Sequence, residues 1–119
     1  MIYVYQNFSK NDKKQFDPLL KKGIQNEIDQ FLKKSLLKNQ EIVLTKQEDI
    51  RKPYWELNDL FKNFSKHLTR TYDGYSHRDL PIMIVRLLVT GHLLESNLTV
   101  FSPEGRKKIL EMEDRMRQM

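Results

Sequence analysis

The sequence contains no cysteine, which excludes disulfide bonds, thiolate metal sites and a cysteine nucleophile. Glycine and proline are scarce, with four of each among 119 residues, so few positions interrupt a helix. The longest apolar stretch, residues 80–94, contains Arg86 and His92, whereas a membrane helix needs about 20 largely apolar residues. The start shows no signal-peptide pattern. We therefore expect a soluble, cytoplasmic protein without a membrane-spanning segment.

Patterns that mark an active site are also missing. Residues 77–80 read His-Arg-Asp-Leu, as in the protein-kinase catalytic loop, but the glycine-rich loop, the Asp-Phe-Gly motif and the required asparagine are absent. The three histidines lack metal-binding spacing, and no serine lies in a Gly-x-Ser-x-Gly turn. We expect a protein that is not an enzyme and that carries neither a cofactor nor a metal.

The positive charge is unevenly distributed along this basic protein. The net charge is +5, and residues 1–53 hold 11 basic and 7 acidic side chains. Residues 54–97 hold 5 of each, and residues 98–119 hold 5 basic and 4 acidic side chains. A basic excess favours an anionic partner such as nucleic acid. A lysine-rich solvated surface accounts for the same total equally well.

Apolar residues recur at helical spacing in three segments, at about 19–38, 54–71 and 79–90. The third segment is apolar on nearly every side, which is typical of a helix in a core or at an interface. A fourth helix is predicted from Pro103, because Ser102 suits the N-cap position. Asp73-Gly74 and Gly91 are typical helix stops.

Two short segments have β-prone composition instead, Ile2–Tyr5 and Leu98–Phe101. The second of them alternates in polarity like a strand. A third short segment, Glu41–Leu44, is an apolar run that fits a strand, a bend or a few core contacts. Together these patterns predict a mainly α, four-helix-type single domain over residues 1–119 with a small β-hairpin. Residues 1–18 are predicted as an N-terminal strand or loop, and residues 19–119 as the helical core.

In the C-terminal half, residues 87–93 read LLVTGHL and residues 101–109 read FSPEGRKKI. These two motifs resemble the winged-helix pattern of bacterial transcription regulators. The first is similar to the Leu-x-x-x-Gly end of a recognition helix, and the second to the helix start that follows the wing. The resemblance implies a winged-helix fold and DNA binding. The sequence departs from the pattern in offering few basic residues along the recognition helix and in placing Glu95 at the wing.

Two hypotheses for function follow. In the first, the chain is a regulatory domain that binds nucleic acid through five basic side chains: Arg78, Arg86, Arg106, Lys107 and Lys108. In the second, it is a helical protein-interaction or homodimerisation module without nucleic-acid binding, with an apolar seam at Met83, Leu87, Met112 and Met116. Core packing explains the same four residues. Arg86 either faces solvent or contacts an acceptor, because a buried guanidinium needs a partner.

Overall fold

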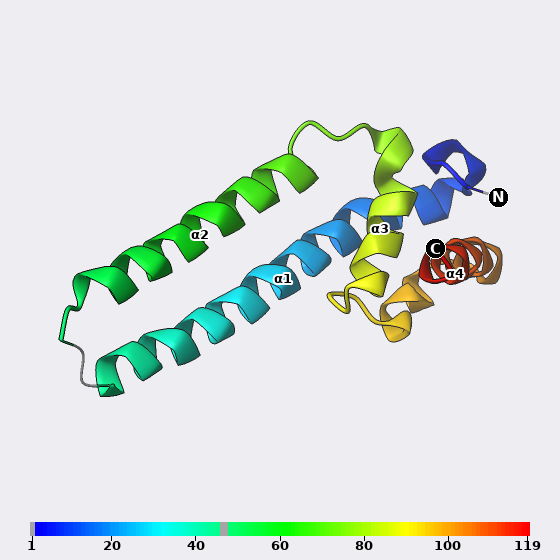
Figure 1. Cartoon of the computed structure of the whole chain (residues 1–119). Coiled ribbons are helices and arrows are strands. Elements are labelled where there is room, and N and C mark those ends of the chain that lie inside the picture. The colour runs from blue at the N-terminus through cyan, green and yellow to red at the C-terminus, as the bar shows by residue number, and fades with distance from the viewer. Residues whose placement is uncertain (1, 46–47) are drawn as a thin grey trace. The chain divides into compact units, whose positions relative to one another are not determined.

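The computed structural model describes residues 2–45 and 48–119, and within these residues every regular element is a helix (Figure 1). Four are α-helices: α1 (Lys10–Leu44), α2 (Arg51–Tyr72), α3 (Leu80–Val89) and α4 (Pro103–Arg117). Three are short 3₁₀ helices: η1 (Tyr5–Asn7), η2 (His77–Asp79) and η3 (Glu95–Val100). The mainly α prediction is confirmed, whereas the predicted β-hairpin is absent from the described residues.

The segment Leu98–Phe101 shows why the predicted strand is wrong. A strand would place Leu98 and Val100 on one face, because side chains alternate with a period of two. Leu98 is instead fully buried together with Phe101, three residues later, while Val100 is 49% exposed. A spacing of three matches a 3₁₀ turn, in which residues i and i+3 share one side. Packing of these two side chains therefore selects η3 over a wing.

The long helix α1 extends beyond the predicted helix of residues 19–38 at both ends. It begins at Lys10, nine residues before the predicted start, because Ser9 Oγ accepts the Asp12 backbone N–H at 3.1 Å and caps the first turn. Pro18, which is exposed, lies inside the helix without ending it. The helix then continues through Glu41–Leu44, for which a strand, a bend and a few core contacts were the alternatives. The N-terminal segment likewise forms η1 instead of a strand.

Contacts divide the chain into two compact units. Unit 1 comprises Met1–Glu27 and Tyr75–Met119. Its core is built around α3, which is buried on most sides and packs against α4. Apolar side chains exposed by 5% or less form this core: Phe8, Phe16, Leu19, Leu20, Leu80, Met83, Ile84, Val85, Leu87, Leu88, Leu93, Leu98, Phe101, Ile109 and Met112.

Unit 2 comprises Ile28–Gly74, and so contains the second part of α1 and all of α2. Aromatic contacts join the two helices. The Phe31 ring stacks on Phe64 with centroids 3.9 Å apart, and it meets Phe61 edge-on at 5.1 Å. Half-buried Leu57, Leu60 and Leu68 lie on the same side of α2 as Phe64. The helical spacing predicted for residues 54–71 is confirmed.

A buried carboxylate ties the start of α1 to the start of α4 within unit 1. Asp12 is 3% exposed, and its oxygens accept the Ser102 backbone N–H at 2.7 Å and the Ser102 hydroxyl at 2.6 Å. Ser102 Oγ in turn accepts the Gly105 N–H at 3.1 Å, which confirms Ser102 as the N-cap of α4. Burial raises the pKa of Asp12, but hydrogen bonds from Ser102 and Ser9 and the charge of Lys108 outweigh it, so the pKa is lowered.

Asp12→Asn is expected to lower the free energy of unfolding by about 2 kcal/mol at neutral pH, the scale for hydrogen bonds to a charged group. Because the pKa is lower in the folded state, ionised Asp12 stabilises the protein above its unfolded-state pKa of about 3.9, and this contribution is lost as the pH falls through the folded-state value. Urea unfolding followed by circular dichroism, repeated from neutral to acid pH, measures the difference in unfolding free energy between the wild type and the variant. The unfolding free energies of the wild type and the variant should converge in acid. A difference between them that does not change with pH would contradict a stabilising role for ionised Asp12. Asp79→Asn, at an exposed carboxylate, is the control.

Candidate interaction surface

Unit 2 carries a set of exposed apolar side chains that its two helices leave uncovered. On α1, Leu32, Leu36 and Val43 are separated by four and seven residues and so lie on one side of the helix. Ile50, directly before α2, and Tyr54 and Phe61 on α2 have the same spacing. All six are between 41% and 73% exposed. We call these six residues the hairpin face.

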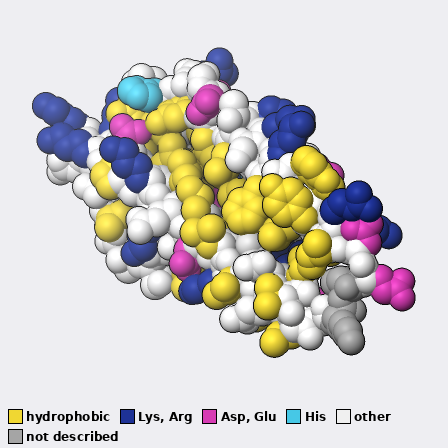
Figure 2. Space-filling view, turned by 90° about the vertical axis from the view of Figure 1, so that its left-hand side faces the viewer, with side chains coloured by type: hydrophobic (Ala, Val, Ile, Leu, Met, Phe, Trp, Pro, Cys, Tyr) yellow, Lys and Arg dark blue, Asp and Glu magenta, His cyan; other side chains and the backbone are white. Residues whose placement is uncertain are grey.

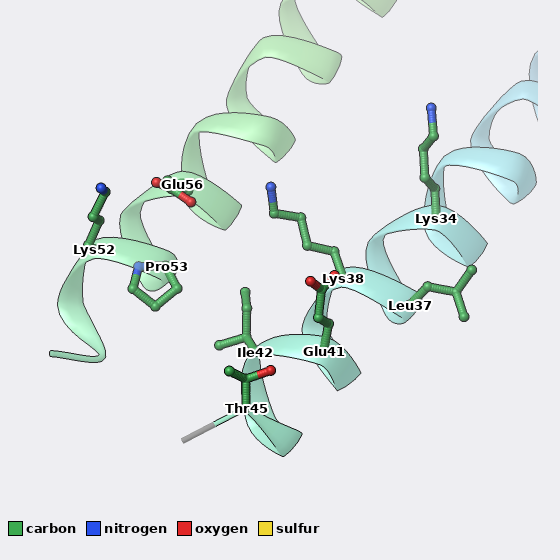
Figure 3. Close-up of a pocket in the computed structure, with 9 residues that line it drawn as sticks. All are labelled: Lys34, Leu37, Lys38, Glu41, Ile42, Thr45, Lys52, Pro53 and Glu56. Carbon is green, nitrogen blue, oxygen red and sulfur yellow. The ribbon is translucent and has the colours of Figure 1, made fainter. Parts of the chain in front are cut away.

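A groove of about 600 Å³ takes up the other side of the two helices. On α1 it is lined by Lys34, Leu37, Lys38, Glu41 and Ile42, with Thr45, and on α2 by Lys52, Pro53 and Glu56. Figure 3 shows the lysine and glutamate side chains of this groove, three lysines and two glutamates. Lys34, Glu41 and Lys52 of this groove each lie two residues before a hairpin-face residue, so helical geometry places them on nearly the opposite side of their helices. Figure 2 shows hydrophobic side chains gathered in a continuous band flanked by lysine and arginine.

The hairpin face is exposed because unit 2 has no apolar core of its own. Among its described residues only Ser35 is buried, and it donates a hydrogen bond from Oγ to the Phe31 carbonyl at 2.8 Å. Every fully buried apolar side chain of the described chain belongs to unit 1. Large contiguous apolar patches are rare on monomeric proteins and usually mark an interaction site. The hairpin face is therefore the candidate site of this protein.

The five basic residues predicted to contact nucleic acid all lie in unit 1, but they differ in solvent exposure and in their contacts. Arg78, Arg86 and Lys107 are exposed. The exposure of Arg86 confirms the interpretation in which its side chain faces solvent. Arg106 is half-buried and donates to the carbonyls of Leu98 and Phe101 at 3.4 Å, so it holds η3 against α4. Lys108 donates to the Asn7 carbonyl and lies 5.4 Å from the centre of the Phe8 ring.

The four residues predicted for an apolar seam lie in unit 1 as well. Met83, Leu87 and Met112 are between 2% and 5% exposed, and Met116 is half-buried. Core packing, the alternative explanation, accounts for the burial of the first three. The six exposed apolar side chains of the hairpin face lie instead on unit 2.

The described residues show no other chemical site. No group of three or more histidine, aspartate or glutamate side chains among them is placed to hold a metal ion. No helix within residues 2–45 and 48–119 is long and apolar enough to cross a membrane. The imidazole Nδ1 of His92 is buried without a hydrogen-bond partner, although Asn26 donates to the backbone carbonyl of the same residue at 2.8 Å.

No protein-family model and no curated protein matches the sequence. The structure is similar to that of the Fluorescence Recovery Protein of Fremyella diplosiphon, with a TM-score of 0.66 and 17% sequence identity. The match covers 91% of this chain and 98% of that chain. Identity this low shows a shared fold and nothing further. With η3 in place of a wing, this all-helical likeness overturns the winged-helix interpretation.

Proposed function

We propose that this chain is a non-enzymatic regulatory domain that acts through protein–protein contact, and that its hairpin face pairs with the hairpin face of a second copy. The observation that carries the proposal is the hairpin face itself, whose six large apolar side chains are between 41% and 73% exposed. Burial of such side chains stabilises an association by roughly 25 cal/mol per Å² removed from water.

A second copy suits this surface better than an unrelated partner for a reason of symmetry. A face that is apolar on both contributing helices is complementary to itself, as a two-fold interface requires. Two such hairpins packed face to face form a four-helix arrangement with an apolar interior. The charges of unit 2 support this pairing, since the lysines and glutamates of the groove lie on the opposite side and remain in water.

The test is the oligomeric state of the full chain, measured by analytical ultracentrifugation over a range of concentrations. We expect a reversible dimer whose dissociation constant increases about 100-fold in the double variant Leu36→Glu/Tyr54→Glu, because each substitution places a charge in an apolar contact. The matched control, Leu94→Glu/Val100→Glu, changes two side chains of similar exposure in unit 1 and should leave the dimer intact.

A cross-linking experiment keeps the proposal testable if the charged variant unfolds. The sequence has no cysteine, so Leu36→Cys introduces a single thiol on the hairpin face. A bifunctional thiol reagent should link two copies of this variant and should leave Leu94→Cys, in unit 1, unlinked. A wild-type protein that stays monomeric at all concentrations would overturn the proposal, as would equal cross-linking of the two variants.

A further inference from the structure

A row of three cations runs along α2 without any partner from the chain itself. Lys62, Lys66 and Arg70 are separated by four residues each, so they lie on one side of the helix, and all three are exposed. No side-chain hydrogen bond or ion pair joins them to another described residue. We call these three residues the cationic row.

Several other cations of the chain are held by internal contacts. Lys33 pairs with Asp29 at 2.9 Å, Arg51 with Asp49 at 3.0 Å, and Arg117 with Glu113 at 3.1 Å. These contacts neutralise the charges within the chain. Lys34, Lys38 and Lys52 of unit 2 are also without an ion pair to another described residue, but they line a groove that includes Glu41 and Glu56. The groove beside the cationic row has no acidic lining residue among those described, so its positive charge is not offset there.

The cationic row borders a shallow groove of about 790 Å³, whose remaining lining residues are Ser65 and Thr69. Both have short side chains that leave room between the longer ones, and both carry a hydroxyl that can donate a hydrogen bond. Arg70 can bind a carboxylate through two parallel N–H groups. The groove thus offers three positive charges and two hydroxyl donors to an anionic ligand.

The spacing of the cationic row fits carboxylates on another helix. Cations four residues apart are separated by about 6 Å along the helix axis, since each residue adds about 1.5 Å. Acidic residues at every fourth position of a partner helix repeat at the same interval. Such a helix laid along α2 would bring a carboxylate to each cation in turn.

Acidic residues close both ends of the cationic row. Asp59 lies three residues before Lys62, and Asp73 lies three residues after Arg70; both are exposed. A nucleic-acid backbone continues past three phosphates and would meet these carboxylates, and binding to it depends on neutralising many phosphates. The geometry favours a short anionic segment over a long polyanion.

We propose that the cationic row is a docking site for a short acidic segment of a partner protein, with carboxylates three or four residues apart. The site is separate from the hairpin face, whose α2 residues lie on another side of the helix, and it does not depend on dimer formation. Regulation by protein contact would then use two surfaces of unit 2, one apolar and one charged.

The test uses the full chain and a fluorescent helical peptide of alanine with glutamate at every fourth position. Fluorescence anisotropy at about 50 mM salt should show binding that weakens at about 200 mM, since exposed ion pairs are screened. The triple variant Lys62→Gln/Lys66→Gln/Arg70→Gln should bind about tenfold more weakly, because each exposed pair contributes modestly. A peptide with glutamine in place of glutamate should not bind.

The control removes the same net charge from a different surface. Lys10, Lys14 and Lys21 are exposed on α1, and Asp17 interrupts their row. Substitution of these three lysines by glutamine should leave peptide affinity unchanged. An equal loss in the control would overturn the docking site, because net charge alone would then explain binding. Tighter binding of a random-sequence DNA duplex, lost in the same triple variant, would also overturn it in favour of nucleic acid.

Discussion

Phe16→Ala is expected to lower the free energy of unfolding by about 4 kcal/mol, the range found when a buried phenylalanine is truncated and a cavity remains. Phe16 on α1 is fully buried. Its ring contacts three others in unit 1, with centroids 5.0 Å from Phe8, 5.0 Å from Phe101 and 6.0 Å from Tyr5. Since these three rings come from η1, the residue that follows it and the segment before α4, one truncation on α1 loosens several elements together.

Urea unfolding followed by circular dichroism measures this loss. Phe16→Leu should recover part of it, because a smaller apolar side chain leaves a smaller cavity. Lys14→Ala, an exposed change on the same helix, should shift stability by less than about 0.5 kcal/mol. If Phe16→Ala were as mild as Lys14→Ala, the aromatic cluster would not be the centre of the unit 1 core.

Gly105→Ala is expected to destabilise the protein by about 3 kcal/mol, although alanine is normally the better helix former. A Cβ atom at this position would lie 2.3 Å from Asp12 Oδ2 and 2.9 Å from Asp12 Cγ, well inside contact distance. The carboxylate cannot move aside freely, because Ser102 binds it through both its N–H and its hydroxyl. The methyl group therefore displaces a buried charge from its donors.

A double-mutant cycle tests this explanation. Gly105→Ala should cost less in a protein that already carries Asp12→Asn, since the charged hydrogen bonds are then gone. Thermal unfolding of the four proteins gives the coupling. Additive losses would show that the cost of Gly105→Ala arises elsewhere in α4. Glu104→Ala, at an exposed neighbouring position, serves as the control for an ordinary change in the first turn.

The helices were the part of the fold that the sequence predicted well, because their apolar residues repeat at helical spacing. Residues 54–71 and 79–90 closely match α2 and α3, and Gly91, with a φ of 81°, follows α3 as the helix stop predicted. The short β-prone segments misled because four residues carry no reliable period. Only the packing of Leu98 with Phe101 decides between a strand and a 3₁₀ turn, and sequence alone does not show it.

The candidate site was harder to predict, because a helical apolar stripe looks the same whether it is covered or exposed. Phe61 belongs to the apolar residues at helical spacing in segment 54–71, yet it is 41% exposed. Conversely, Met83 and Met112 were candidates for a seam and are core residues. What separates the two cases is the amount of chain available to cover each helix. Unit 1 surrounds α3, and unit 2 has two helices only.

The cationic row escaped the sequence analysis for a different reason. Residues 54–97 carry equal numbers of basic and acidic side chains, so their total charge suggested no anionic partner. The total charge of a segment, however, does not show how its charged side chains are arranged in space. Lys62, Lys66 and Arg70 lie on one side of α2, and helical geometry brings them together although the segment is neutral.

The only tryptophan of the chain, Trp55, lies in unit 2 and is 58% exposed. Its ring is 5.3 Å from that of Tyr54, a hairpin-face residue, in an edge-on arrangement. Light absorbed by indole is therefore emitted from α2 alone, and unit 1 contributes nothing to that emission. The intrinsic fluorescence of Trp55 therefore reports on the environment of the hairpin face, and it can be measured in the unmodified protein without attaching a dye.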